Sequence, residues 1–306
     1  MPERAQPWRR VASKAAARTR EVLGIGALSR RLDAIEARLG AMGAERWPHG
    51  PVYLGDRTAV VATRWGAKII VDTADVIIAP WLLLDGLWEA DVTAWLQATL
   101  RPGQVFVDVG ANIGYFTVLA GMLVGPEGRV VGVEAHPHVA GILRRNVVMN
   151  GLQRHVDTYH RAAWSEPTTL EFHLRVHYSA SSSVSSAGEA GLASLHDVEE
   201  VVQVQAVPLD ELLAEVPRVD VMKIDVEGAE VRVVQGLERT LRANPGITIM
   251  FEWSPDLLDK MGDSGPALVD LLSGHGFGFR QIDGDLVDID RHRLLDLPYG
   301  NIVARR

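Results

Sequence analysis

Residues 105–117 constrain the fold of this chain more than any other segment. They read VFVDVGANIGYFT, an apolar strand pattern that runs directly into a turn with two glycines and then into the start of a helix. Open α/β sheets bind ligands at the carboxyl ends of their parallel strands, and glycines there leave a backbone without side-chain bulk. The segment therefore predicts a Rossmann-like α/β fold with a nucleoside-binding loop. An ordinary tight turn from strand to helix is the alternative interpretation.

The spacing within this loop separates two classes of nucleoside cofactor. A dinucleotide fingerprint has the pattern Gly-x-Gly-x-x-Gly and leaves the helix amino end free for a pyrophosphate. Here Asp108 precedes Gly110 by two residues, and Ala111 occupies the second glycine position. We expect the Asp108 carboxylate to face the space that a pyrophosphate would fill. This favours a cationic, phosphate-free ligand such as S-adenosylmethionine.

A second acid ends the next expected strand, residues 129–134. Glu134 lies twenty-four residues after Gly110. A carboxylate at that position can accept hydrogen bonds from both hydroxyls of an adenosine ribose. His136, in the turn that follows, is expected beside the adenine. The alternative for Glu134 is a solvated acid at the end of a strand.

Four sequence blocks resemble the FkbM family of S-adenosylmethionine-dependent methyltransferases. They are DVGANIG at 108–114, GPEGRVVGVE at 125–134, LDEL at 209–212 and MKIDVEGAE at 222–230. The resemblance spans roughly residues 88–253, and the last block is the specific one because many methyltransferases share the first. Residues 134–137 depart from the family, since they read EAHP where the family usually shows Glu-Pro-x-Pro.

The resemblance and the strand pattern together predict a class I methyltransferase fold. Seven strands are expected in a mostly parallel sheet with helices on both faces and a late antiparallel edge, preceded by an N-terminal helix and a small β unit. The expected cofactor contacts come from the strand ends and from a Gly-x-x-Glu element that the family carries before the first strand. They are Glu89, Asp108, Gly110, Ala111, Asn112, Gly114, Glu134, His136, Ala162 and Ala163.

Two further acids are the candidate catalytic residues. Asp225 ends the expected strand over 219–225, and Glu252 lies near the end of the strand over 246–253. A close pair of carboxylates can raise one pKa and supply a general base for an alcohol, or can hold Mg²⁺ through oxygen ligands. A structural role is the third interpretation. The sequence leaves a divalent metal open, with Asp225 and Glu252 as its ligands if one is used.

Composition narrows the function classes. The 306 residues are 47% hydrophobic and include no cysteine, so a large core is expected and disulfides and thiolate metal sites are excluded. The formal net charge of -8 argues against nucleic-acid binding. No secretory signal and no apolar run of about 18 residues is found, so we expect no transmembrane segment and a cytoplasmic location.

An uneven distribution of charge divides the chain into three expected parts. Residues 1–46 carry ten Lys or Arg against five Asp or Glu and form a basic helical segment. Its apolar seam over 25–42 suits a short coiled coil that makes a homo-oligomer, a helix docked on its own catalytic domain, or a surface helix that contacts anionic lipid or a partner. Residues 47–101 are expected to form a small β-rich unit and a pocket-covering segment. Residues 102–306 are the expected cofactor-binding catalytic domain.

A serine-rich insert at 168–207 interrupts the catalytic domain. It is too long for a plain connector and is the candidate substrate loop, with a mobile surface insert as the alternative. The sequence thus predicts an O-methyltransferase that acts on a hydroxyl of a sugar, glycan or specialised metabolite. An NAD-type oxidoreductase and a non-catalytic nucleoside-binding scaffold are the competing functions. The sequence does not identify the acceptor.

Overall fold

The computed structural model describes residues 50–186, 188, 197–216 and 218–306. Every element described below belongs to the unit Pro51–Arg306. The basic segment at 1–46, with its apolar seam at 25–42, lies outside the described residues. Its helix and its role in self-association therefore stay predictions.

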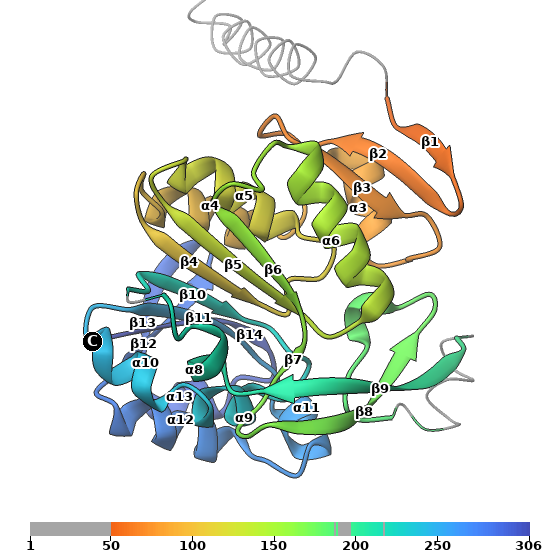
Figure 1. Ribbon diagram of the computed structural model, residues 1–306. Helices are drawn as coiled ribbons and strands as arrows, with labels where there is room; N and C mark the ends of the chain where they lie inside the picture. Colours follow the sequence, from red (N-terminus) through yellow and green to blue (C-terminus); the bar gives the residue numbers. More distant parts are fainter. Residues whose placement is uncertain (1–49, 187, 189–196, 217) are drawn as a thin grey trace, which may run out of the picture. The chain divides into compact units, whose positions relative to one another are not determined.

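The unit Pro51–Arg306 is built on one twisted sheet of eight strands in the order β13-β12-β14-β11-β10-β4-β5-β6 (Figure 1). Five strands are parallel: β4 (Val105–Val109), β5 (Arg129–Glu134), β6 (Val156–His160), β10 (Val221–Ile224) and β11 (Thr248–Trp253). Three antiparallel strands complete one edge: β12 (Gly278–Asp283), β13 (Asp285–Ile289) and β14 (Gly300–Arg305). The expected mostly parallel α/β sheet is confirmed.

The sheet has one strand more than the seven expected. The additional strand is β13, which pairs with β12 across Gly284 as an edge hairpin. Its sequence, DLVDI, has acids at the first and fourth positions and is mostly exposed, so it carries little of the apolar signal that marks a buried strand. Only the pairing with β12 makes it part of the sheet.

Helices cover both faces of the sheet because the parallel strands are apolar on both sides. Phe106 and Val107 are neighbours in β4 and belong to two different core clusters, one on each face. The first cluster includes side chains of α4 (Ala90–Thr99), α5 (Tyr115–Val124) and α6 (Pro137–Met149). The second includes side chains of α8 (Leu209–Leu212), α9 (Glu230–Gln235), α10 (Glu238–Ala243), α11 (Pro255–Lys260), α12 (Gly265–Gly274) and α13 (Arg291–Leu295).

The chain order reverses at the centre of the sheet. Strand β4 has β5 on one side and β10 on the other, so the connections after β4 and after β10 leave in different directions. A crevice opens at such a reversal, outside the carboxyl ends of the strands, and this is where open α/β sheets bind ligands. The fold therefore places the loops after β4, β5, β10 and β11 around one potential site.

Two small sheets flank the central one. Strands β1 (Val52–Gly55), β2 (Thr58–Ala62) and β3 (Lys68–Asp72) form an antiparallel sheet that is followed by α3 (Ile78–Asp85). The insert forms an antiparallel hairpin of β8 (Thr168–Arg175) and β9 (Glu199–Val207). Strand β7 (Ala162–Ala163) pairs in parallel with β9, which makes a sheet of three strands. The short helix η1 (Ser179–Ser181) follows β8 in the sequence. Residues 156–160 and 162–163, which lie next to each other in the sequence, thus belong to two different sheets.

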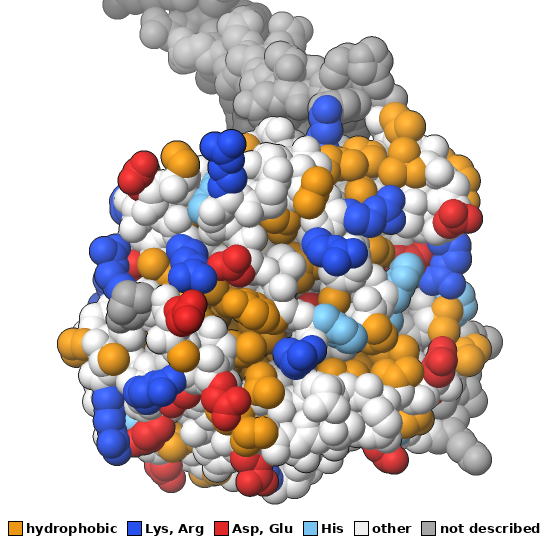
Figure 2. Space-filling view, viewed as in Figure 1, with side chains coloured by type: hydrophobic (Ala, Val, Ile, Leu, Met, Phe, Trp, Pro, Cys, Tyr) orange, Lys and Arg blue, Asp and Glu red, His pale blue; other side chains and the backbone are white. Residues whose placement is uncertain are grey.

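The described surface mixes both signs of charge. On the face drawn in Figure 2, Lys and Arg side chains alternate with Asp and Glu and do not gather into one basic patch. Among the described residues, no helix is both long enough and apolar enough to span a membrane.

One buried side chain links the first small sheet to α6 and to the loop after β4. Asn146 is fully buried; its Oδ1 accepts a hydrogen bond from the Ile70 N–H at 2.6 Å, and its Nδ2 donates to the carbonyls of Ile70 and Ile113 at 3.0 and 2.7 Å. One turn later, the half-buried Asn150 makes the same paired contacts with the backbone of Lys68. The two asparagines differ mainly in burial.

Asn146→Ala should therefore lower the free energy of unfolding much more than Asn150→Ala. The first change leaves three buried backbone groups without partners, a loss on the order of 3 kcal/mol, whereas water replaces the partners of Lys68 at a cost below about 1 kcal/mol. Denaturant titration of both variants measures the difference. Equal losses would show that burial of Asn146 does not decide its contribution.

Candidate active site

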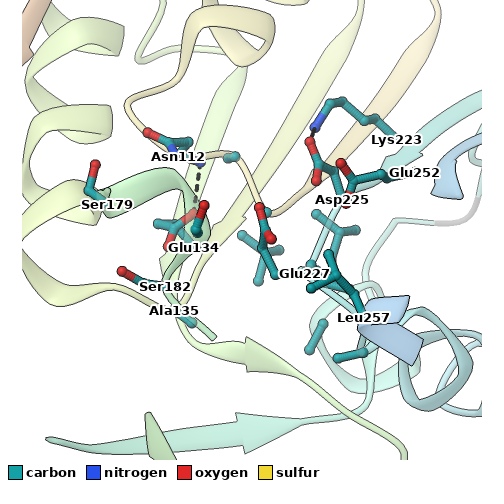
Figure 3. Close-up of a pocket in the computed structure, with 18 of the residues that line it drawn as sticks. Asn112, Glu134, Ala135, Ser179, Ser182, Lys223, Asp225, Glu227, Glu252 and Leu257 are labelled. Atoms are coloured by element: carbon teal, nitrogen blue, oxygen red, sulfur yellow. Dashed lines mark hydrogen bonds and ion pairs between the residues drawn. The ribbon is translucent and has the colours of Figure 1, made fainter. Parts of the chain in front are cut away.

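A cavity of about 580 Å³ opens at the carboxyl ends of the parallel strands, where the chain order reverses. Its walls include residues from the loops after β4, β5, β10 and β11, from the segment before α4, and from the insert. Figure 3 shows acidic side chains from these different elements turned toward the same space. Residues far apart in the sequence therefore meet at one site.

Gly110 is required by a backbone contact at the base of this cavity. Its φ is +77°, and a Cβ there would lie 1.7 Å from the carbonyl oxygen of Asp225. The N–H groups of Gly110 and Ala111 both donate to the Val133 carbonyl, at 2.9 and 3.0 Å. The loop after β4 is thus pressed between the ends of β5 and β10. The glycine is needed for this packing, whether or not a ligand is bound.

Glu134 orders the neighbouring loops and also reaches the cavity. Its Oε2 accepts a hydrogen bond from the N–H of Asn112, and its Oε1 accepts one from the N–H of His136, both at 2.7 Å. Burial raises the pKa of Glu134 to about 7, against the opposing effect of these backbone donors. Each carboxylate oxygen keeps acceptor capacity for a further donor, so the residue suits the two hydroxyls of a ribose.

Seven of the ten residues expected to contact the cofactor line the cavity: Glu89, Gly110, Ala111, Asn112, Glu134, Ala162 and Ala163. The other three, Asp108, Gly114 and His136, lie behind its wall. A Cβ on Gly114 would lie 2.5 Å from the Leu143 side chain, so this glycine permits close packing of α6. The ring of His136 is buried 6.3 Å from the ring of His138, and burial lowers its pKa to about 4.

The expectation that Asp108 faces the ligand space is wrong. The residue is 0% exposed, and its Oδ2 accepts a hydrogen bond from Thr117 Oγ1 on α5 at 2.6 Å. Alternation along β4 turns its side chain toward the helix face, where Lys223 is its registered neighbour on β10. Asp108 therefore acts on the cavity through Lys223, whose side chain does line it.

Both candidate catalytic acids reach the cavity, and a third acid joins them. Oxygens of Asp225, Glu227 and Glu252 all lie within 4.8 Å of one another, a cluster that could hold a metal ion. The buried Lys223 ammonium donates a hydrogen bond to the Asp225 carboxylate at 2.8 Å, which forms an ion pair (Figure 3). Tyr299 OH donates to Glu252 Oε1 at 3.0 Å, whereas Glu252 Oε2 is buried without a hydrogen-bond partner among the described residues.

Crowding of carboxylates in a buried space shifts their proton affinities. Burial, together with the charge of Asp225, raises the pKa of Glu89 to about 7 and that of Glu227 to about 8, and raises the pKa of Glu252 well above its usual value. Burial opposes the charge of Lys223, but the surrounding acids outweigh it and raise its pKa. Raised carboxyl pKa values of this kind suit a general base for an alcohol.

Sequence reasoning missed Lys223, Glu227 and Tyr299 as site residues. Lys223 had a usable signal, because it is the one charged residue in the buried strand β10 and alternation puts it on the same face as Asp225. Glu227 had a weaker one, since it follows a strand end. Its positive φ of 55° directs it into the cavity. Tyr299 had none, because it reaches Glu252 from a loop 47 residues away.

The insert forms one wall of the cavity. Its contributions are Phe172, Arg175, Ser179, Ser181, Ser182 and Val184. Two of its hydroxyls are engaged: Ser179 donates to Asp75 at 2.6 Å, and Ser182 Oγ accepts from the Arg175 N–H at 2.9 Å. In Figure 3, Ser179 and Ser182 lie on the side of the cavity away from Lys223 and Glu252.

Comparison with known proteins places this geometry in context. A sequence model described as the methyltransferase FkbM domain matches residues 108–280, more than half of the chain. The 31-O-demethyl-FK506 methyltransferase FkbM of Streptomyces tacrolimicus is 31% identical over 199 residues, which cover 58% of this chain and 74% of that protein. A protein-L-isoaspartate O-methyltransferase of Triticum aestivum is 44% identical over 79 residues, which cover 26% of this chain and only 30% of that protein.

Two of the solved structures that match the chain are methyltransferases of low sequence identity. An O-methyltransferase from Bacillus cereus in complex with SAH is 13% identical with a TM-score of 0.41, covering 71% of this chain and 81% of that one. A precorrin-6y C5,15-methyltransferase from Geobacter metallireducens is 16% identical with a TM-score of 0.41, and the match covers 72% of this chain and 89% of that one. The fold assignment itself rests on the strand order described above.

The buried acids should make the folded protein less stable as the pH rises from 6.5 to 8.5. A glutamic acid ordinarily has a pKa near 4.5, whereas burial and the charge of Asp225 raise the pKa of Glu227 to about 8 in the folded protein. The folded state therefore holds the extra proton in this window, and stability falls with rising pH by up to about 1.4 kcal/mol per pH unit for each such proton. Thermal melting across the window should show a falling Tm.

Glu227→Gln should weaken this dependence because the amide cannot ionise. The variant should melt above wild type at pH 8.5 and show a shallower decline. Glu166→Gln, a change of an exposed acid outside the cavity, is the matched control and should keep the wild-type slope. A wild-type Tm that is flat or rising across the window would contradict the raised pKa values.

Proposed function

Because the chain belongs to the FkbM methyltransferase family, we propose that it transfers a methyl group from S-adenosylmethionine to a hydroxyl of a sugar, glycan or specialised metabolite. Family membership makes it an S-adenosylmethionine-dependent methyltransferase. The cluster of Asp225, Glu227 and Glu252 at the cavity is the observation that carries the choice of a hydroxyl acceptor. An alcohol must lose a proton during transfer, and carboxylates with raised pKa values suit that task. The Streptomyces relative is named for an oxygen acceptor, which agrees with the choice.

The residues at the ends of β4, β5 and β6 fit the nucleoside part of the cofactor. Glu134 presents acceptor oxygens for the ribose hydroxyls, and Ala162 and Ala163 leave an apolar surface without bulk for the adenine. The loop at Gly110 and Ala111 keeps the base of the cavity open. When bound, S-adenosylmethionine supplies a methyl carbon attached to a sulfonium, which is already a good leaving group.

The chain's own part in the chemistry is to orient the acceptor and to hold its proton. The Glu252 carboxylate lines the cavity and keeps one oxygen, Oε2, without a hydrogen-bond partner among the described residues, so it is the group assigned to accept the hydroxyl proton. Asp225, held by Lys223, positions the same hydroxyl. Alignment and exclusion of water supply the rest of the acceleration.

A divalent cation is the second proposal for the same oxygens. Asp225, Glu227 and Glu252 supply hard carboxylate ligands of the type that Mg²⁺ binds, and a cation would relieve their mutual repulsion. A cytoplasmic location and self-association through residues 25–42 also stay predictions. The competing assignment to an NAD-type oxidoreductase is replaced by the family membership.

Calorimetry should show that S-adenosylhomocysteine binds and that NAD does not. Glu134→Gln should weaken binding of S-adenosylhomocysteine by about ten- to a hundredfold, because hydrogen bonds to a charged group contribute about 1.5–3 kcal/mol. Glu166→Gln is the matched control and should bind like wild type. A Glu134→Gln variant that melts normally and binds with wild-type affinity would overturn the ribose assignment.

Turnover should depend on the acid pair. Incubation with labelled S-adenosylmethionine and fractionated glycans, glycolipids and small metabolites identifies an accepted fraction. With that fraction, Asp225→Asn and Glu252→Gln should each lower the rate by roughly 10²-fold or more, with far smaller changes in cofactor affinity.

Chelation separates the two chemical roles of these acids. EDTA should leave the rate of wild type unchanged if Glu252 is a base. A loss of activity that Mg²⁺ restores would instead make the carboxylates metal ligands. Wild-type rates in both acid variants would remove the pair from the mechanism altogether.

A further inference from the structure

Arg175 is a cavity-lining cation whose side chain has no bonding partner in the described part of the chain. It ends β8 in the insert, and its Nε is buried without a hydrogen-bond partner. No ion pair or side-chain hydrogen bond of its guanidinium occurs among the described residues. A charged side chain that lines a cavity without a protein partner is explained most simply by a ligand that pairs with its guanidinium.

Glu227, an acid of the same cavity, does not satisfy Arg175. Its positive charge lowers the pKa of Glu227 to a small extent, so the two residues share the cavity, yet they form no ion pair within 4.0 Å. A space therefore separates the guanidinium from the acid cluster. Arg161, the other arginine of the cavity lining, donates to the His160 carbonyl at 2.8 Å and is exposed, so it is solvated and already partnered.

The chemistry of a guanidinium defines what belongs in that space. It offers five N–H donors in a planar fork and no acceptor, a geometry that matches carboxylate and phosphate oxygens. A neutral sugar hydroxyl would leave its charge uncompensated. The acids on the other side repel an anion, which directs the anionic group of a ligand toward Arg175 and its hydroxyl toward Glu252.

On the basis of the proposed function, we propose that the acceptor carries an oxyanion, a carboxylate or a phosphate, and that Arg175 binds it while a hydroxyl of the same molecule lies at the acid cluster. Arg175 is then the residue that selects acidic acceptors over neutral ones. The insert supplies this selection because it holds Arg175, whereas the strand ends supply the chemistry.

Ligand stabilisation tests the proposal without turnover. The protein saturated with S-adenosylhomocysteine is melted with D-glucuronate, glucose 6-phosphate or D-glucose, each at increasing concentration. At least one of the two anionic sugars should raise the Tm and D-glucose should not; which of them does so identifies the oxyanion. Arg175→Gln should lose this shift, and Arg161→Gln, the matched change in the same cavity, should keep it.

Three results would overturn the proposal. They are the absence of a shift with both anionic sugars, an equal shift with D-glucose, and an undiminished shift in Arg175→Gln. A Tm rise with S-adenosylhomocysteine alone must be the same in Arg175→Gln and wild type; a loss there would show that Arg175 binds the cofactor carboxylate instead. Failure of S-adenosylhomocysteine to stabilise wild type would count against the proposed function itself, and this result is distinguishable from the three that concern Arg175.

The accepted fraction supplies a second measurement. Reduction of its carboxylates or removal of its phosphates should lower kcat/KM for wild type by about ten- to a hundredfold, the factor expected for a charge-assisted pair. Arg175→Gln should show a similar loss on the untreated acceptor, mainly through KM, and little further loss on the treated one. If the loss in kcat/KM for Arg175→Gln on the treated acceptor equals the product of the two separate losses, Arg175 and the oxyanion act independently.

Discussion

The close approach of two backbone segments at the centre of the sheet determines the rest of the site. The Asp225 N–H donates to the Val109 carbonyl at 3.0 Å, and the Asp225 carbonyl occupies the place that a Cβ on residue 110 would take. This contact sets the separation between the loop after β4, which faces the nucleoside, and the acids after β10 and β11. A larger residue at Gly110 would move these two halves of the site apart.

The same contact brings like charges together, and a single buried lysine offsets part of their repulsion. Lys223 pairs with Asp225 and also lies beside Asp108, its neighbour in the strand register. Burial and the excess of acids over cations raise the pKa of Glu227 to about 8 and raise that of Glu252 well above its usual value. The proposed chemistry uses these raised pKa values. The same values are expected to make the folded protein less stable as the pH rises.

Two additions to the central sheet complete the cavity. The first small sheet is connected to α6 through Asn146, and the segment that follows it brings Trp88 and Glu89 to the cavity wall. The strand ends line the cavity with acids, whereas the insert lines it with an arginine and several serines. The strand ends thus carry features expected of any S-adenosylmethionine-dependent enzyme of this family, while the insert carries features that can distinguish one acceptor from another.

The sequence alone determined the family, the parallel sheet and the position of the loop after β4, because these depend on local patterns: an apolar strand, glycines at a turn and acids at strand ends. It also identified Glu134, Asp225 and Glu252 as residues of one cavity. Only the tertiary structure decided that Asp108 faces α5, that β13 joins the sheet, and that Tyr299 reaches Glu252. These outcomes depend on side-chain direction and on contacts between distant segments, which packing of the whole domain selects and no local pattern encodes.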